Sequence, residues 1–372
     1  MQQTESLGAF KNWFNPDTAA ALGARVHALH PGFDLTAYRA GLATLTRLEL
    51  KDRVRLIATA LHAAMNLPFP QAAAVLCGTL GPPVDPSVPN SFQMIVWPLT
   101  HYVGRYGLDH FEPSMAALHA MTQRATAEFD IRPFLIREPG RTLEVLARWV
   151  EDPSEHVRRL VSEGTRTRLP WGGHLVAFIA DPSPVLPLLE RLRDDPSPYV
   201  RRSVANNLND IARDHPALVT GLAARWMAGA PTPERRSLVA RALRGLVKKG
   251  DPAALAALGH DGGEALEVTD LRGPPTARIG EALRFRFTLT NPSGAPLSAV
   301  VDYRVHHAGA RGGRAPKVFK LRTLTVPAGG VVQIEKAHSL KVVTTRTLYP
   351  GAHRLEVQVN GRIAAGFDFK LI

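Results

Sequence analysis

The sequence has a single cysteine among 372 residues, Cys77, which excludes an intrachain disulfide and a cysteine-rich zinc site. It also lacks an uninterrupted apolar run of about 18 residues, which a membrane-spanning helix requires. The first residues, MQQTESLGAFKNWFNPD, do not show the basic segment and apolar stretch of a secretory signal. We therefore expect a protein of the reducing cytoplasm, with no membrane partner.

Cofactor signatures are missing as well. Neither the phosphate-binding motif G-x-x-x-x-G-K-[ST] nor the dinucleotide fingerprint G-x-G-x-x-G occurs, so we expect no nucleotide cofactor. The closest histidine groupings are His27 with His30 and His306 with His307, and neither has a third ligand at the spacing of known metal sites. We expect no metal.

Acidic residues are scarce in the last part of the chain. The formal net charge of the whole sequence is +12. Residues 266–372 hold 16 lysines and arginines against 7 acidic residues, whereas residues 1–265 hold 29 against 26. A basic balance alone indicates solubility and non-specific attraction, but its concentration in one region favours a polyanionic partner such as a nucleic acid.

The first two thirds of the chain show apolar residues at spacings of three and four, as in FDLTAYRAGLATL, RTLEVLARWVED and RRSLVARALRGLVKK, which predicts amphipathic helices. EDPSEHVRRLVSEG, residues 151–164, aligns with DDPSPYVRRSVANN, residues 194–207, at a period of 43 residues. This period is typical of HEAT or armadillo repeats, which stack into a curved solenoid. We expect the recurring arginines to form a positive stripe on its concave face: Arg158, Arg159, Arg201 and Arg202.

A change of composition follows at residues 259–275, where GHDGGEALEVTDLRGPP is rich in glycine and proline. Beyond it, alternating runs such as LRFRFTLTN and KVFKLRTLTV predict about seven short strands, and Asn360-Gly361 has the chemistry of a hairpin turn. The fold class is therefore multidomain α and β. We predict a HEAT-like helical domain over residues 1–262 and an immunoglobulin-like β-sandwich over residues 263–372.

One stretch combines groups that can form a chemical site. SEGTRTRLPWGG, residues 162–173, holds the carboxylate of Glu163, the aromatic ring of Trp171, and two arginines, Arg166 and Arg168. A carboxylate in such a setting should stay ionised. Loops of helical repeats also carry structural ion pairs and packing tryptophans, so the stretch by itself leaves both interpretations open.

Two further acidic residues lie one repeat away from this stretch on either side. SVANNLNDIARDHP places Asp210 on a helix that the repeat predicts to face inward, and QRATAEFDIRPFLIREP places Glu128 before an aromatic residue. Local ion pairs with Arg213 for Asp210, and with Arg124 or Arg132 for Glu128, are the alternative interpretation.

Together, TAEFDIRPFL, VRRLVSEGTRTRLPWGG and VANNLNDIARDHP resemble the AlkC-type DNA glycosylases, relatives of the AlkD-type enzymes built from HEAT-like repeats. Because that family includes members with a C-terminal immunoglobulin-like domain, the resemblance covers essentially the whole chain. It implies excision of cationic alkylated bases from double-stranded DNA. It also implies that Glu163, then Asp210 and Glu128, supply the catalytic carboxylates, that Trp171 contacts the lesion nucleotide, and that Arg159 holds a nearby phosphate.

The implied chemistry suits these residue types. A base alkylated at N3 is already cationic and leaves as a neutral molecule, so the site needs carboxylates to stabilise the oxocarbenium sugar and to activate water. The resemblance also implies that the base is not flipped into a pocket, and it leaves 3-methyladenine, 3-methylcytosine and 7-methylguanine open as substrates. Arg158, Arg166 and Arg168 are candidates for further backbone contacts or for structural ion pairs.

The basic C-terminal domain is expected to contact the duplex through the segment HHAGARGGRAPKVFKLR. The candidate residues are Arg311, Arg314, Lys317 and Lys320. We expect a nucleoid-associated monomer without an obligate protein partner. The alternative function is a non-enzymatic HEAT-repeat scaffold that binds DNA or protein. That alternative leaves unexplained why three carboxylates lie on a face that binds phosphates.

Overall fold

The computed structural model describes residues 9–85, 93–260, 263–309, 312–313, 316–342 and 347–372. The chain divides into two compact units, residues 1–214 and 215–372. The change from helices to strands comes between Ala257, where the last α-helix ends, and Glu267, where the first strand begins. The domain limits at 262 and 263 stay a prediction, since helices after residue 214 belong to the same compact unit as the strands.

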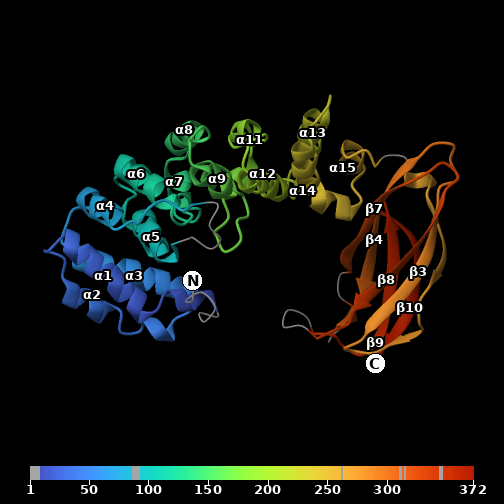
Figure 1. The fold of residues 1–372 in the computed structure, drawn as a ribbon, viewed down its shortest axis with the longest axis horizontal. Coiled ribbons are helices and arrows are strands. Elements are labelled where there is room, and N and C mark those ends of the chain that lie inside the picture. Colours follow the sequence, from blue (N-terminus) through green and yellow to red (C-terminus); the bar gives the residue numbers. More distant parts are fainter. Residues whose placement is uncertain (1–8, 86–92, 261–262, 310–311, 314–315, 343–346) are drawn as a thin grey trace. The chain divides into compact units, whose positions relative to one another are not determined.

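The first unit is helical, and most of its short helices follow one another through brief loops (Figure 1). Its helices are α1 Pro16–Leu29, α2 Leu35–Gly41, α3 Leu50–Met65, α4 Phe69–Gly78, α5 Trp97–Tyr106, α6 Phe111–Thr122, α7 Arg132–Arg137, α8 Pro139–Trp149, α9 Glu155–Gly164, α10 Val176–Ala180, α11 Leu186–Leu192 and α12 Pro198–Ile211. Single 3₁₀ turns lie at Phe10–Trp13, Leu45–Arg47 and Met94–Val96. Among the described residues, no helix is long and apolar enough to span a membrane.

Both copies of the repeated motif build the same loop and helix start. Oδ1 of Asp152 accepts a hydrogen bond from the backbone N–H of Ser154 at 2.8 Å, and Asp195 does the same for Ser197 at 2.8 Å. These Asx turns lead into α9 and α12, which pack against each other. The repeat predicted from the sequence is therefore confirmed as a structural repeat.

The first arginine of each motif holds its own loop. Nη1 of Arg158 donates to the carbonyl oxygens of Asp152 and Pro153 at 2.8 and 3.1 Å. In the second repeat, Nη1 of Arg201 donates to the corresponding carbonyls in the same way. Arg158 also forms a bidentate ion pair with Asp195 of the next repeat, at 2.6 and 3.0 Å. This position therefore has a structural role in both repeats.

The second unit begins with helices α13 Pro216–Met227, α14 Pro233–Lys249 and α15 Pro252–Ala257 and a 3₁₀ turn at Gly263–Ala265, and continues as a β-sandwich. Its strands are β1 Glu267–Arg272, β2 Thr276–Ala277, β3 Ala282–Thr290, β4 Leu297–His306, β5 Ala308–Gly309, β6 Gly312–Gly313, β7 Lys317–Val326, β8 Val331–Ser339, β9 Gly351–Val359 and β10 Arg362–Leu371. One sheet has the order β1-β3-β8, the other β2-β10-β9-β4-β7, and β5 pairs with β6.

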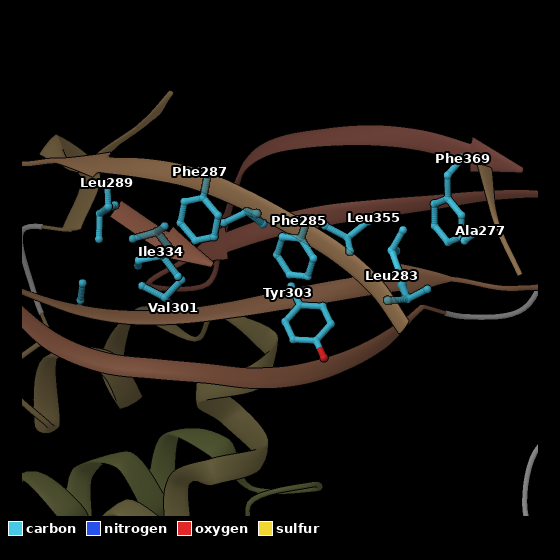
Figure 2. Packing of buried hydrophobic residues seen from close by; sticks show 14 of the residues in the cluster. Ala277, Leu283, Phe285, Phe287, Leu289, Val301, Tyr303, Ile334, Leu355 and Phe369 are labelled. Carbon is cyan, nitrogen blue, oxygen red and sulfur yellow. The ribbon is translucent and has the colours of Figure 1, made fainter. Parts of the chain in front are cut away.

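Alternation along the strands fills the interior of the sandwich. In β3, Leu283, Phe285, Phe287 and Leu289 are buried between the sheets, as Figure 2 shows, while Arg284 and its outward neighbours face solvent. The hairpin between β9 and β10 turns at Asn360 and Gly361, which both have positive φ, 43° and 80°. The expected order of helical repeats followed by a β-sandwich is confirmed.

Candidate active site

The centre of the site is Glu163, in the last turn of α9. Its side chain is buried, and the residue is 5% exposed. Oε1 accepts from Nη1 of Arg166 at 2.6 Å, and Oε2 accepts from Oγ of Ser203 at 2.5 Å. Nη2 of Arg159 lies 3.4 Å from Oε1. A carboxylate has about four lone-pair positions, so these partners leave one for a further donor.

Arg166 connects two of the predicted carboxylates. Its Nε donates to Oδ2 of Asp210 on α12 at 2.8 Å, while its Nη1 holds Glu163. All three residues are buried. A guanidinium between two carboxylates fixes the geometry of both, because its planar donors match carboxylate oxygens.

The third predicted carboxylate belongs to the same network. Oε2 of Glu128 accepts from Nη1 of Arg159 at 2.5 Å and from Oγ1 of Thr126 at 3.0 Å. The guanidinium of Arg159 also lies over the ring of Tyr199, 5.0 Å from its centroid. The structure thus brings Glu128, Glu163 and Asp210 together through two arginines.

The pKa values of Glu163 and Asp210 are shifted in opposite directions. Burial tends to raise the pKa of Glu163, but the charges of Arg159 and Arg166 and the hydrogen bonds from Ser203 and Arg166 outweigh it, so the pKa lies below its usual value. Burial dominates at Asp210, and its pKa is raised despite the hydrogen bond and charge of Arg166. Glu163 is therefore held as an anion, whereas burial shifts Asp210 toward its neutral form.

Trp171 is presented to solvent in a strained backbone conformation. Its φ is 65°, in the left-handed region that a bulky residue rarely adopts, and it is 63% exposed. Two cations hold this loop by its carbonyl oxygens. Nζ of Lys51 donates to the carbonyl of Trp171, and Nη2 of Arg132 donates to that of Gly173. These bonds fix the backbone of the loop that carries the exposed indole.

Arg132 supports the site from behind. Its Nη1 donates to the carbonyl oxygens of Gly164 and Arg166 at 2.9 and 2.7 Å. Together with the bond from Nη2 to Gly173, one buried side chain therefore binds both ends of the stretch that carries the site. Burial, followed by the nearby charge of Arg166, lowers the pKa of the Arg132 guanidinium to about 10. It stays charged at neutral pH.

A cleft of about 480 Å³ opens over these groups. Glu128 and Glu163 line it, whereas Asp210 is not among the lining residues and lies behind Arg166. The other lining residues are mainly apolar or aromatic: Met94, Trp97, Ala125, Thr126, Phe129, Arg159, Arg166, Leu169, Pro170, Trp171 and Tyr199. Such a cleft strengthens the field of its carboxylates, because little water screens them.

The other predicted arginines and lysines form no ion pair with the three carboxylates among the described residues. Arg168 forms a bidentate ion pair with Asp214 at 2.9 and 3.1 Å. Arg202, the second arginine of its repeat, is exposed on α12. In the sandwich, Lys317 and Lys320 are exposed on β7. Arg311 and Arg314 lie outside the described residues.

Sequence reasoning missed Ser203, Tyr199 and Lys51 as parts of the site. It considered Arg132 only as an ion-pair partner of Glu128, which pairs with Arg159 instead. Ser203 follows Glu163 by 40 residues, close to the repeat period, and this spacing was a usable signal for a neighbouring helix face. Arg132 and Lys51 bind backbone carbonyls, and no residue type or spacing in the sequence predicts such partners. Within the part of the chain that the structure describes, no group of three or more histidine, cysteine or acidic residues has the arrangement of a metal site.

Comparison with known proteins identifies relatives of both the helical part and the β-sandwich. The model of the C-terminal Ig-like domain of the uncharacterised protein YhaZ matches residues 267–372, and the HEAT-repeat model matches residues 185–215. Uncharacterized protein YhaZ of Bacillus subtilis (strain 168) is 36% identical over 370 residues, covering 98% of this chain and 100% of that protein. The solved structure of Pseudomonas fluorescens alkylpurine DNA glycosylase AlkC, bound to DNA containing an abasic site analog, matches with a TM-score of 0.89. Its identity is 36%, and the match covers 98% of this chain and 99% of that one.

Proposed function

The chain belongs to the family of YhaZ and the AlkC-type DNA glycosylases, and from this premise we propose that it is a DNA glycosylase that removes cationic alkylated bases. The observation that carries the proposal is the aromatic cleft with Glu163 and Glu128, where arginines keep Glu163 ionised. A protein that only binds DNA does not need carboxylates in a cleft that faces the DNA, because each carboxylate would repel the phosphates.

The reaction is the hydrolysis of an N-glycosidic bond. In 3-methyladenine or 3-methylcytosine nucleotides the base carries a positive charge, so the bond electrons return to the base and it departs neutral without protonation. The sugar becomes an oxocarbenium ion. Glu163 stabilises this cation, because its negative charge is fixed in a cleft of low polarity before the reaction begins.

Water completes the reaction at the anomeric carbon. The water oxygen forms the new bond, and one of its protons passes to a carboxylate of the cleft. Two carboxylate positions can accept this proton. One is the remaining lone pair of Glu163, and the other is Oε1 of Glu128, which has no hydrogen-bond partner among the described residues. Asp210 acts through Arg166 as a positioning residue.

Trp171 contacts the lesion nucleotide. An exposed indole at the rim of the cleft presents a face to the sugar or to the cationic base, and a cation-π contact contributes about 0.5–2 kcal/mol. A rim residue reaches DNA without a deep cavity, which supports excision without flipping the base into the protein. Arg159 and Arg166 hold carboxylates, so the phosphate contacts fall to exposed cations such as Arg202, Lys317 and Lys320.

The test is product identification. Duplex DNA treated with a methylating agent is incubated with the protein, and the released bases are separated and identified by mass spectrometry. We expect free 3-methyladenine or 3-methylcytosine to appear with time, and the strand to retain abasic sites. Folded protein that binds abasic-analogue DNA but releases no base would instead establish the non-enzymatic scaffold.

A further inference from the structure

A second cleft lies on the other side of the aromatic wall that bounds the carboxylates. Its volume is about 390 Å³. Trp97, Phe129 and Trp171 line both clefts, so these side chains form a partition between them. The rings of Trp97 and Phe129 stack at 5.3 Å, which makes the partition rigid. Whatever the second cleft binds therefore lies next to the lesion site.

The charged residues of the second cleft are mainly cations, whereas in the first cleft two arginines pair with two glutamates. Lys51, Arg55 and Arg105 line it. Its one acidic lining residue, Asp130, is buried and already accepts hydrogen bonds from Thr100 at 2.6 Å and from His101 at 3.1 Å. The cleft therefore presents uncompensated positive charge.

Two of these cations remain available for a ligand. Arg55 pairs with Asp52 at 3.0 Å. Lys51 and Arg105 form no ion pair with any carboxylate among the described residues, and both are exposed. Arg105 contacts the ring of Tyr106, with its guanidinium carbon 5.5 Å from the centroid. Lys51 donates to the carbonyl of Trp171, which leaves the other N–H groups of its ammonium, and the guanidinium of Arg105, to bind an anion.

Part of the lining of the cleft is apolar. Ile136, which is 68% exposed, lines the cleft together with Pro133 and Val54. A lining that combines cations with exposed apolar surface matches one unit of a DNA strand, whose phosphate is anionic and whose sugar is largely apolar on its faces. An inorganic anion would make no use of the apolar lining.

We propose that this cleft binds the backbone phosphate of a nucleotide adjacent to the lesion, between Lys51 and Arg105, with the sugar against Ile136. The proposal rests on the proposed function, since it places that phosphate beside an alkylated nucleotide. Lys51 also donates to the carbonyl of Trp171, so the residue that holds the phosphate also fixes the loop that contacts the lesion.

Double-mutant cycles between protein and DNA test the proposal without any excision step. The duplexes contain a non-cleavable abasic analogue, and each carries one neutral methylphosphonate at a different position near it. The proteins are the wild type, Arg105→Gln, Lys51→Gln and Arg39→Gln. Arg39 provides a matched control, because it is exposed on α2 and lines neither cleft. Dissociation constants are measured by fluorescence anisotropy over a range of salt concentrations.

We expect Arg105→Gln to weaken binding to ordinary DNA about tenfold, the value of one hydrogen bond to a charged group, and to reduce the salt slope by about 0.9. At one methylphosphonate position, within about two nucleotides of the analogue, the same substitution should cost less than about twofold, because its partner phosphate is already neutral. Lys51→Gln should couple to the same position. Arg39→Gln should show no coupling.

Three results would overturn the proposal. If methylphosphonates weaken the wild type but none couples to Arg105, the phosphate lies elsewhere while the proposed glycosylase stands. If inorganic phosphate competes through Arg105 and no DNA position couples, the cleft is a site for free phosphate. A wild type that binds no DNA would contradict both this proposal and the proposed function.

Discussion

Replacing Glu163 by glutamine removes one charge from the centre of the site and preserves its shape. The remaining carboxylates keep the arginines paired, since Arg166 still has Asp210 and Arg159 still has Glu128. The free energy of unfolding should therefore fall by about 1–3 kcal/mol, less than the ~3–5 kcal/mol expected when a buried charge is left alone. The loss of one fixed electrostatic stabiliser in a desolvated site should slow the chemical step about 10²–10³-fold.

The assay is single-turnover release of methylated bases at saturating protein, with affinity for abasic-analogue DNA measured in parallel. Glu155→Gln is the matched control, because Glu155 lies on the same helix and outside the cleft. We expect the rate to fall for Glu163→Gln alone while the affinity of both variants stays within about threefold of the wild type. A variant that excises at the wild-type rate, or whose rate falls only in proportion to affinity, would refute the role given to Glu163.

Four further predictions concern stability and binding. Trp171→Gly should preserve or raise the melting temperature, because it relieves a positive φ, while base release falls; calorimetry and the release assay separate the two effects. Arg132→Lys should lower the free energy of unfolding by about 3 kcal/mol in urea titration, because one ammonium nitrogen cannot occupy the positions from which Nη1 and Nη2 of the guanidinium bind their carbonyls. Because the pKa of Glu163 is lower in the folded than in the unfolded protein, its ionisation adds to the free energy of unfolding. This contribution is complete above about pH 4.3, the pKa in the unfolded chain, and is lost as the pH falls through the pKa in the folded protein. Glu163→Gln should therefore weaken the dependence of the melting temperature on pH at acid pH. Lys317→Gln with Lys320→Gln should reduce the salt slope of DNA affinity by about two, and an unchanged slope would remove β7 from the interface.

The repeat made much of the helical fold predictable. The period of 43 residues predicts that α9 and α12 are neighbouring helices. In the structure, Glu163 on α9 and Asp210 on α12 bind the same arginine, Arg166. The alternating runs of the last third predicted the main strands of the sandwich, including the turn at Asn360. In each case a local pattern was enough, because burial of one face dictates which residues alternate.

The roles of the arginines were not predictable in the same way. The sequence shows Arg158 and Arg159 as equivalent neighbours, yet the first binds loop carbonyls and Asp195, and the second binds Glu128 over the ring of Tyr199. Which partner each arginine takes depends on loop carbonyls and on side chains from other helices. A one-dimensional pattern does not contain these distances.

The layering of the carboxylates also emerged only from the structure. Asp210 ranked second from the sequence, but it lies behind Arg166, whereas Glu128, with the weakest sequence signal, lines the cleft. The local motif around Asp210 reports that an acid is present and says nothing of what stands between it and solvent. We therefore base the roles proposed for the three carboxylates on their burial and contacts.

In the proposed mechanism, fixed anions stabilise the sugar oxocarbenium ion while a base that already carries a positive charge departs, and no acid protonates the leaving group. The most direct measurement compares single-turnover release of 3-methyladenine or 3-methylcytosine with release of neutral hypoxanthine, each in duplex DNA. We predict that the cationic bases are released about 10²–10⁴-fold faster, the factor that a general acid would otherwise supply. Equal rates for the neutral base would contradict the account, because they would require a proton donor in the cleft.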